Sequence, residues 1–90
     1  STSFAVFEPN SEMTWLKVRV MIENYLNGLW SQGALAGSKA EDAYFVHVGL
    51  GKTMTAQDIL EGRMIVKVGM AAVRPAEFII MQFSHLVQKS

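Results

Sequence analysis

The chain has 90 residues, half of them hydrophobic, and its eight basic residues balance eight acidic ones. A chain of this length forms one domain, which we predict over residues 1–90. Because neither sign of charge is concentrated along the sequence, nothing indicates binding to nucleic acid or to an anionic membrane. No apolar run approaches the roughly 20 residues of a membrane helix, so no membrane insertion is expected. The absence of cysteine excludes a disulfide framework and thiolate metal sites.

The first elements predicted are a short strand and a long helix. Residues 4–8 alternate weakly between apolar and other side chains and end at Pro9, which fits a strand. Asn10 offers an N-cap to a helix over residues 11–31. Apolar residues recur there at steps of three and four, which predicts one buried stripe. The stripe consists of Trp15, Val18, Ile22, Tyr25, Leu26 and Leu29.

The opposite side of this helix is polar but weakly charged. It carries Lys17, Asn24, Asn27 and Ser31, interrupted by Met13, Val20 and Met21. One interpretation is a helix wedged between a sheet and a loop of its own domain. The other is a second docking face for another protein, because a solvated face is normally more charged.

The middle of the chain predicts a strand, a short helix and another strand. Residues 33–37 contain two glycines and form a loop, and residues 43–49 alternate as a strand. Thr55 with Asp58 resembles a capping box that opens one or two helical turns, which Gly62 closes. A strand follows over residues 63–68. The order β-α-β-α-β-β predicts an α+β fold: a small mixed sheet packed by one long amphipathic helix plus a short helix, with an extended C-terminal strand.

The final strand is long for a domain of this size. Pro75 ends the preceding run because proline lacks an N–H and drives Arg74 towards extended geometry. A strand from Pro75 to Val87, at roughly 3.3 Å per residue, would span about 43 Å. A compact chain of this length has a radius of gyration of only about 12 Å. We therefore expect residues 84–90 to project from the body as a C-terminal arm.

A projecting apolar strand is an aggregation hazard unless another chain pairs with it. One face of this strand carries Ile79, Met81, Phe83 and Val87, and the other carries Phe78, Ile80, Gln82, Ser84 and Leu86. The residues predicted to contact a neighbouring subunit are Phe78, Ile80, Met81, Phe83, His85, Leu86 and Val87. The alternative is an ordinary last strand with a frayed end.

Nothing in the sequence indicates catalysis, a metal or a cofactor. The segment Gly49–Thr53 ends like a phosphate-binding loop, but the glycine required five residues earlier is replaced by Val46, so a glycine turn is the better interpretation. His47 and His85 lie on different strands without ligands at metal spacing. The adjacent acidic residues 41 and 42 point apart, and Ser84 and His85 face opposite sides of a strand.

Arg74 and Glu77 flank Pro75-Ala76 and are candidates for a charged contact between subunits. A bidentate bond from arginine to carboxylate would fix the orientation of such a contact. The alternative is a solvated surface pair of little energetic value.

Several motifs together resemble the C-terminal domain of contractile tail sheath proteins, which occur in phage tails and phage-derived contractile injection systems. The resemblance covers essentially the whole chain. It is carried by Phe7-Glu8-Pro9-Asn10 before a helix with Trp15, Leu29-Trp30 with Gly33-Ala34-Leu35 and Gly37, Ala43-Tyr44-Phe45-Val46, Val68-Gly69-Met70-Ala71, and Arg74-Pro75-Ala76-Glu77-Phe78.

This resemblance implies a structural role without enzymatic activity. Sheath proteins are several times longer, so the chain is expected to be their C-terminal piece. Members polymerise as hexameric rings stacked into a helical sheath around an inner tube protein, and their terminal arms join strands of neighbouring subunits. The family also implies that the domain touches the tube through a helix, for which residues 11–31 are the candidate, with Lys17, Asn24 and Asn27 outward.

The implied location is a phage virion tail or an extracellular contractile injection particle, assembled in the bacterial cytoplasm. The alternative function is a small soluble ligand-binding or regulatory module that dimerises through edge strands.

Overall fold

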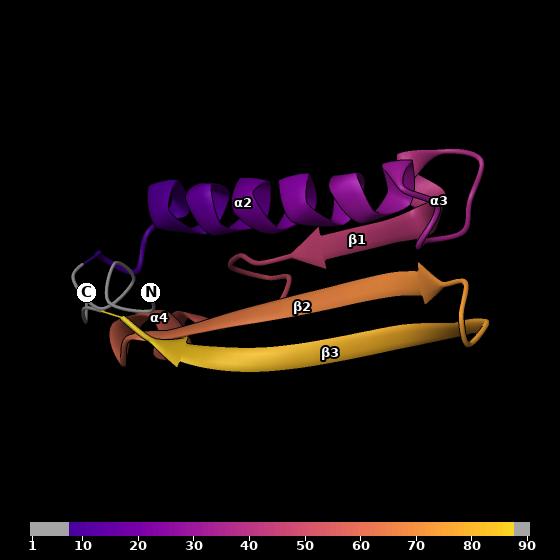
Figure 1. The fold of residues 1–90 in the computed structure, drawn as a ribbon. Coiled ribbons are helices and arrows are strands. Elements are labelled where there is room, and N and C mark those ends of the chain that lie inside the picture. The colour runs from indigo at the N-terminus through magenta and orange to yellow at the C-terminus, as the bar shows by residue number, and fades with distance from the viewer. Residues whose placement is uncertain (1–7, 88–90) are drawn as a thin grey trace.

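The computed structural model describes residues 8–87, which form one helical layer on an antiparallel sheet (Figure 1). The long helix α2 spans Glu12–Ser31, and the short helices α3 and α4 span Ala40–Ala43 and Ala56–Leu60. The strands are β1 (Tyr44–His47), β2 (Arg63–Ala72) and β3 (Glu77–Leu86), in the order β1-β2-β3. The α+β class is confirmed. Among the described residues the sheet is antiparallel throughout, where a mixed sheet was predicted, and residues 4–7 of the predicted first strand lie outside them.

Helix α2 begins one residue later than predicted, and its cap differs. Ser11 occupies the N-cap position with extended backbone and makes no side-chain capping bond. Asn10, the predicted cap, instead bonds Trp15 and two backbone carbonyls outside the helix. The predicted capping box of α4 is confirmed, because the Thr55 hydroxyl accepts from the Asp58 N–H and the Asp58 carboxylate accepts from the Thr55 N–H.

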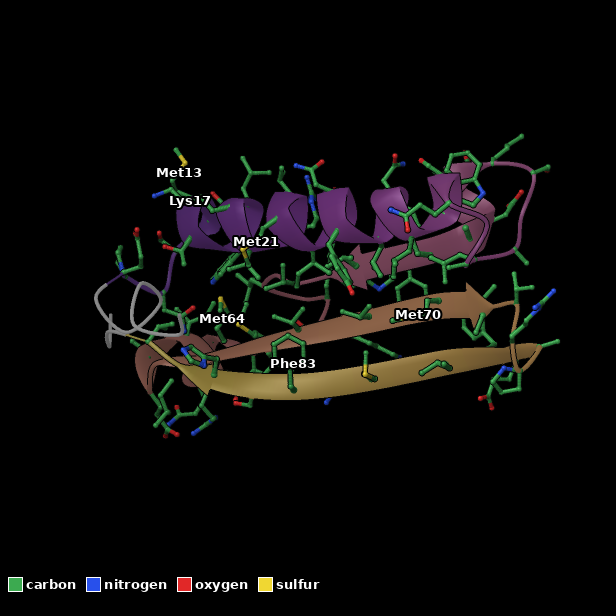
Figure 2. The ribbon with its side chains drawn as sticks, in the orientation of Figure 1. Met13, Lys17, Met21, Met64, Met70 and Phe83 are labelled. Carbon is green, nitrogen blue, oxygen red and sulfur yellow. The ribbon has the colours of Figure 1, made fainter. Side chains whose placement is uncertain are left out.

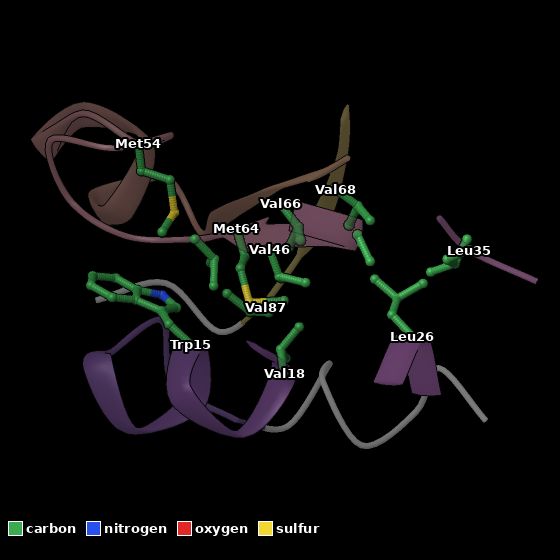
Figure 3. Packing of buried hydrophobic residues seen from close by; sticks show 12 residues of the cluster. Trp15, Val18, Leu26, Leu35, Val46, Met54, Met64, Val66, Val68 and Val87 are labelled. Carbon is green, nitrogen blue, oxygen red and sulfur yellow. The ribbon is translucent and has the colours of Figure 1, made fainter. Parts of the chain in front are cut away.

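The core lies between α2 and one face of the sheet (Figure 3). Trp15, Val18 and Leu26 of the predicted stripe are buried, whereas Tyr25 is 67% exposed and does not belong to it. The sheet contributes Val46 from β1 and alternate residues of β2. The buried hydrophobic residues are Trp15, Val18, Leu26, Leu35, Ala43, Val46, Val48, Met54, Met64, Val66, Val68 and Val87.

Strands β2 and β3 form a long hairpin along the length of the molecule. Their register runs from Arg63 opposite Leu86 to Ala72 opposite Glu77, and residues 73–76 form the turn. The molecule measures 39 × 23 × 19 Å with a radius of gyration of 14.1 Å. An elongated body of this kind accommodates the whole of β3, because β2 offers a ladder of the same length.

Candidate functional site

The described part of the predicted C-terminal arm does not project. Residues 84–86 pair with residues 63–65 of β2, and the Val87 N–H donates to the Gly62 carbonyl at 2.7 Å. Val87 itself is buried in the core at 8% exposure. This corrects the expectation of a free arm from residue 84, and residues 88–90 lie outside the described part of the chain.

Strand β3 is nevertheless an open edge. It pairs with β2 on one side, and within residues 8–87 no strand pairs with its other side. Such an edge presents unpaired backbone N–H and C=O groups. Its apolar side chains are unusually exposed: Phe78 54%, Ile80 55%, Met81 47%, Phe83 45% and Leu86 70%. We call this row, Phe78 to Leu86 with its free backbone, the β3 edge.

Both faces of the sheet contribute to the β3 edge. The pairing register places Met81 and Phe83 beside the buried Val68 and Val66, on the face that α2 packs against. Helix α2 packs mainly along β1, so β3 extends beyond its cover (Figure 1). His85, on the same face, is half-buried opposite Met64.

The outer face of the sheet carries an aromatic cluster around Gly69. The Phe45 ring lies directly over Gly69, where an added Cβ would meet ring carbon Cε2 at 2.1 Å. The Phe45 ring centroid is 4.6 Å from that of His47 and 6.2 Å from that of Phe78. Glycine is therefore required at this position for the ring to cover the sheet, and Phe78 connects the cluster to the β3 edge.

A charged clasp holds the start of β2, beside the end of β3. The Arg63 guanidinium bonds Asp58 Oδ1 at 2.9 Å and also bonds the Glu61 carboxylate. The backbone hydrogen bond from Thr55, with help from Arg63, holds the pKa of the Asp58 carboxyl below its usual range. Hydrogen bonds from Gln57 and then Arg63 lower the pKa of Glu61 in the same way. All three groups are accessible to water, so the clasp orients the turn more than it stabilises the fold.

The three polar residues predicted to face outward from α2 differ in their surroundings. Lys17 is exposed and pairs with Glu8 at 3.2 Å, and Asn24 is exposed. Asn27 is half-buried and donates to the Tyr44 hydroxyl at 3.0 Å, so it faces β1 rather than outward. Tyr44 lies 17 residues along the chain, and no local sequence pattern identifies this contact.

The exposed surface of α2 is mainly apolar, whereas Met13, Val20 and Met21 were predicted only to interrupt a polar face. Met13 points away from the sheet and Met21 lies on the flank that faces it (Figure 2). The exposed large hydrophobic residues of this helix are Met13 65%, Leu16 45%, Val20 42%, Met21 53% and Tyr25 67%. A helix with apolar side chains on both sides is typical of one covered by a partner.

Arg74 and Glu77 are both exposed at the far end of the β2–β3 hairpin. The ion pairs found within residues 8–87 do not include one between them. The structure therefore places both side chains at the surface, without an ion pair between them.

The Gly49–Met54 segment is a closed turn. The Gly49 carbonyl accepts from the N–H groups of Lys52, Thr53 and Met54. The Thr53 hydroxyl accepts from the Gly49 N–H and donates to the Ile65 carbonyl at 2.6 Å, so it fastens the turn to β2. Among residues 8–87 no group of three metal-ligating side chains gathers, and no helix is both long and apolar enough to cross a membrane.

Comparison with known proteins agrees with these features. The family model for the phage tail sheath C-terminal domain matches residues 1–85. No curated protein matches the chain. A chain of the contracted sheath complex of PVC, an extracellular contractile injection system, is 68% identical with a TM-score of 0.76, over 90% of this chain and 23% of that one.

A chain of the anti-feeding prophage (AFP) baseplate, in a 6-fold symmetrised structure, is 60% identical with a TM-score of 0.74. The similarity covers 93% of this chain and 25% of that one, so the chain spans about a quarter of the length of these structures. On the family match, the chain belongs to the phage tail sheath C-terminal domain family, as the sequence resemblance predicted.

Proposed function

We propose that this chain is the C-terminal domain of a structural sheath subunit that polymerises around an inner tube and drives contraction and injection. The observation that carries the proposal is the β3 edge, which is open and apolar in a domain of the sheath family. The proposal gives the chain no enzymatic role, in keeping with its structural relatives. The subunit operates in a phage virion tail or in an extracellular contractile injection particle.

The β3 edge is the surface to which a neighbouring subunit adds a strand. Backbone pairing would satisfy the free N–H and C=O groups of β3, and alternate side chains of the added strand would cover Met81 and Phe83. Rings of six subunits, stacked as a helix, fit the 6-fold symmetry of the AFP baseplate. The backbone ladder between β3 and an added strand holds its register while the connecting segments bend, so neighbouring subunits can rotate without separating.

The first test places a charge in the β3 edge. Phe83→Lys is expected to leave the isolated domain folded, because this side chain is 45% exposed. It should reduce sheath assembly by about tenfold or more, since a lysine on an edge strand opposes strand addition. Sheaths would be counted by electron microscopy and the monomer fold checked by circular dichroism.

The matched control is Leu50→Lys, the same change at a side chain 60% exposed beyond the opposite edge of the sheet. It should assemble normally. Sheaths formed by the Phe83→Lys protein in normal number would refute strand addition at β3.

Contact with the tube is the second part of the proposal. The outward side of α2 combines Lys17 and Asn24 with exposed Met13 and Val20, a surface suited to a partner with apolar and anionic groups. Asn27 is not part of it, because its amide bonds Tyr44. Arg74 and Glu77 remain candidates for a charged contact between subunits.

The second test reverses one charge on this side of α2. Lys17→Glu should weaken attachment of the sheath to purified tube by about tenfold, because a favourable pair becomes a repulsive one. Cosedimentation at low and high salt measures this. Lys52→Glu, on the turn beyond β1, is the control, and equal attachment of both variants would contradict the assignment of α2 to the tube.

A further inference from the structure

Asn10 joins three elements through one buried amide. It is 2% exposed, and its Oδ1 accepts a hydrogen bond from Trp15 Nε1 in α2 at 2.7 Å. Its Nδ2 donates to the carbonyl of Arg63, the first residue of β2, at 3.0 Å and lies 3.4 Å from the carbonyl of Ile59 in α4. An amide suits this place because it alone offers an acceptor and two donors on so short a side chain.

The end of β3 is held at the same corner. Arg63 lies opposite Leu86 in the ladder, and the neighbouring Gly62 carbonyl accepts from the Val87 N–H at 2.7 Å. Asn10 is therefore bonded to the residue that pairs with the last position of β3.

Other links between α2 and the sheet differ from this one. Trp15, Val18 and Leu26 pack on the sheet through apolar contacts, which have no preferred direction. The bond from Asn27 to Tyr44 is directional but reaches β1, at the other side of the sheet. The Asn10 bonds thus form a directional link between α2 and the β2–β3 end of the sheet.

We propose that Asn10 is a positioning residue that makes α2 and the end of β3 move as one body. This rests on the proposed function, in which α2 faces the tube and β3 joins a neighbouring subunit. A displacement of the strands during contraction is then transmitted to the helix. Without Asn10, the helix can slip on its apolar contacts, and the end of β3 is held less firmly at Gly62 and Arg63.

The test measures amide hydrogen exchange at Val87 in the chain in solution. Asn10→Ala should raise the exchange rate of the Val87 N–H by about tenfold or more, because one lost buried hydrogen bond changes an equilibrium constant by about that factor. Tyr44→Phe is the control, since it removes the polar link between α2 and β1. It should leave Val87 within about twofold of the unchanged chain after correction for global stability.

Two further variants separate coupling from loss of folding. Trp15→Phe removes the indole N–H, which is the helix side of the link, and keeps an aromatic ring in the core. After correction for global stability it should also raise exchange at Val87. Asn10→Asp should recover protection at Val87, relative to the unchanged chain, as the pH falls, since a protonated carboxyl can again donate to the Arg63 carbonyl. No effect of Trp15→Phe at Val87, or equal effects of Asn10→Ala and Tyr44→Phe, would overturn the coupling.

The sheath itself gives a separate readout. The Asn10→Ala protein should still form sheaths, because the β3 edge is unchanged, but should retain the tube less well than the Tyr44→Phe protein. If the unchanged protein forms no sheath, the proposed function fails while exchange at Val87 still decides the coupling.

Discussion

Ending the chain after Phe83 is expected to lower its free energy of unfolding by about 3 to 4 kcal/mol. Burying a valine contributes about 2 kcal/mol and a hydrogen bond about 1 kcal/mol, and Val87 supplies both through its core position and its bond to Gly62. The pairing of residues 84–86 with residues 63–65 of β2 is lost as well. Because small domains are stable by only about 5 kcal/mol or somewhat more, most of the stability would be lost. Urea unfolding followed by circular dichroism measures it.

The control ends the chain after Val87 and keeps every one of these contacts. It should unfold within about 0.5 kcal/mol of the unchanged chain. If both truncations unfold at the same urea concentration as the unchanged chain, Val87 does not belong to the core.

The prediction that residues 84–87 project was wrong because of its estimate of size, and residues 88–90 lie outside the described chain. A strand of about 43 Å was compared with a radius of gyration, which assumes a body of similar extent in all directions. The hairpin itself makes the body 39 Å long, so β3 fits within it. The preceding strand was predicted to end at Val68, four residues before its actual end. A strand that short could not pair with the whole of β3, so part of β3 was expected to lack a partner.

The elements were predictable where one local rule decided them. Periodicity located α2, and the capping pair Thr55 and Asp58 located α4, because both signals lie within a few residues. The roles of Asn10 and Asn27 depend on partners far along the chain, Arg63 and Tyr44, which no local pattern identifies. The identity of the open edge strand likewise could not be predicted without the order of the strands in the sheet.

Leu26→Ala is expected to destabilise the domain by about 3 kcal/mol, the usual cost of a cavity left by a buried leucine. Leu26 is 2% exposed and packs near Leu35 and Val68, away from the larger cluster around Trp15 (Figure 3). The melting temperature should fall by about 12 °C or more, since each kcal/mol corresponds to about 4 °C or more in a domain of this size.

The adjacent Tyr25→Ala is the matched control, because that side chain is 67% exposed on the same helix turn. Its effect on the melting temperature should be small, about 2 °C, since it removes few contacts.

The two variants also separate stability from assembly. Leu26→Ala should lower thermal stability and leave the β3 edge intact, so sheaths should still form below its melting temperature. Sheath loss at a temperature where this variant is folded would mean that the helix position, not only the β3 edge, governs assembly.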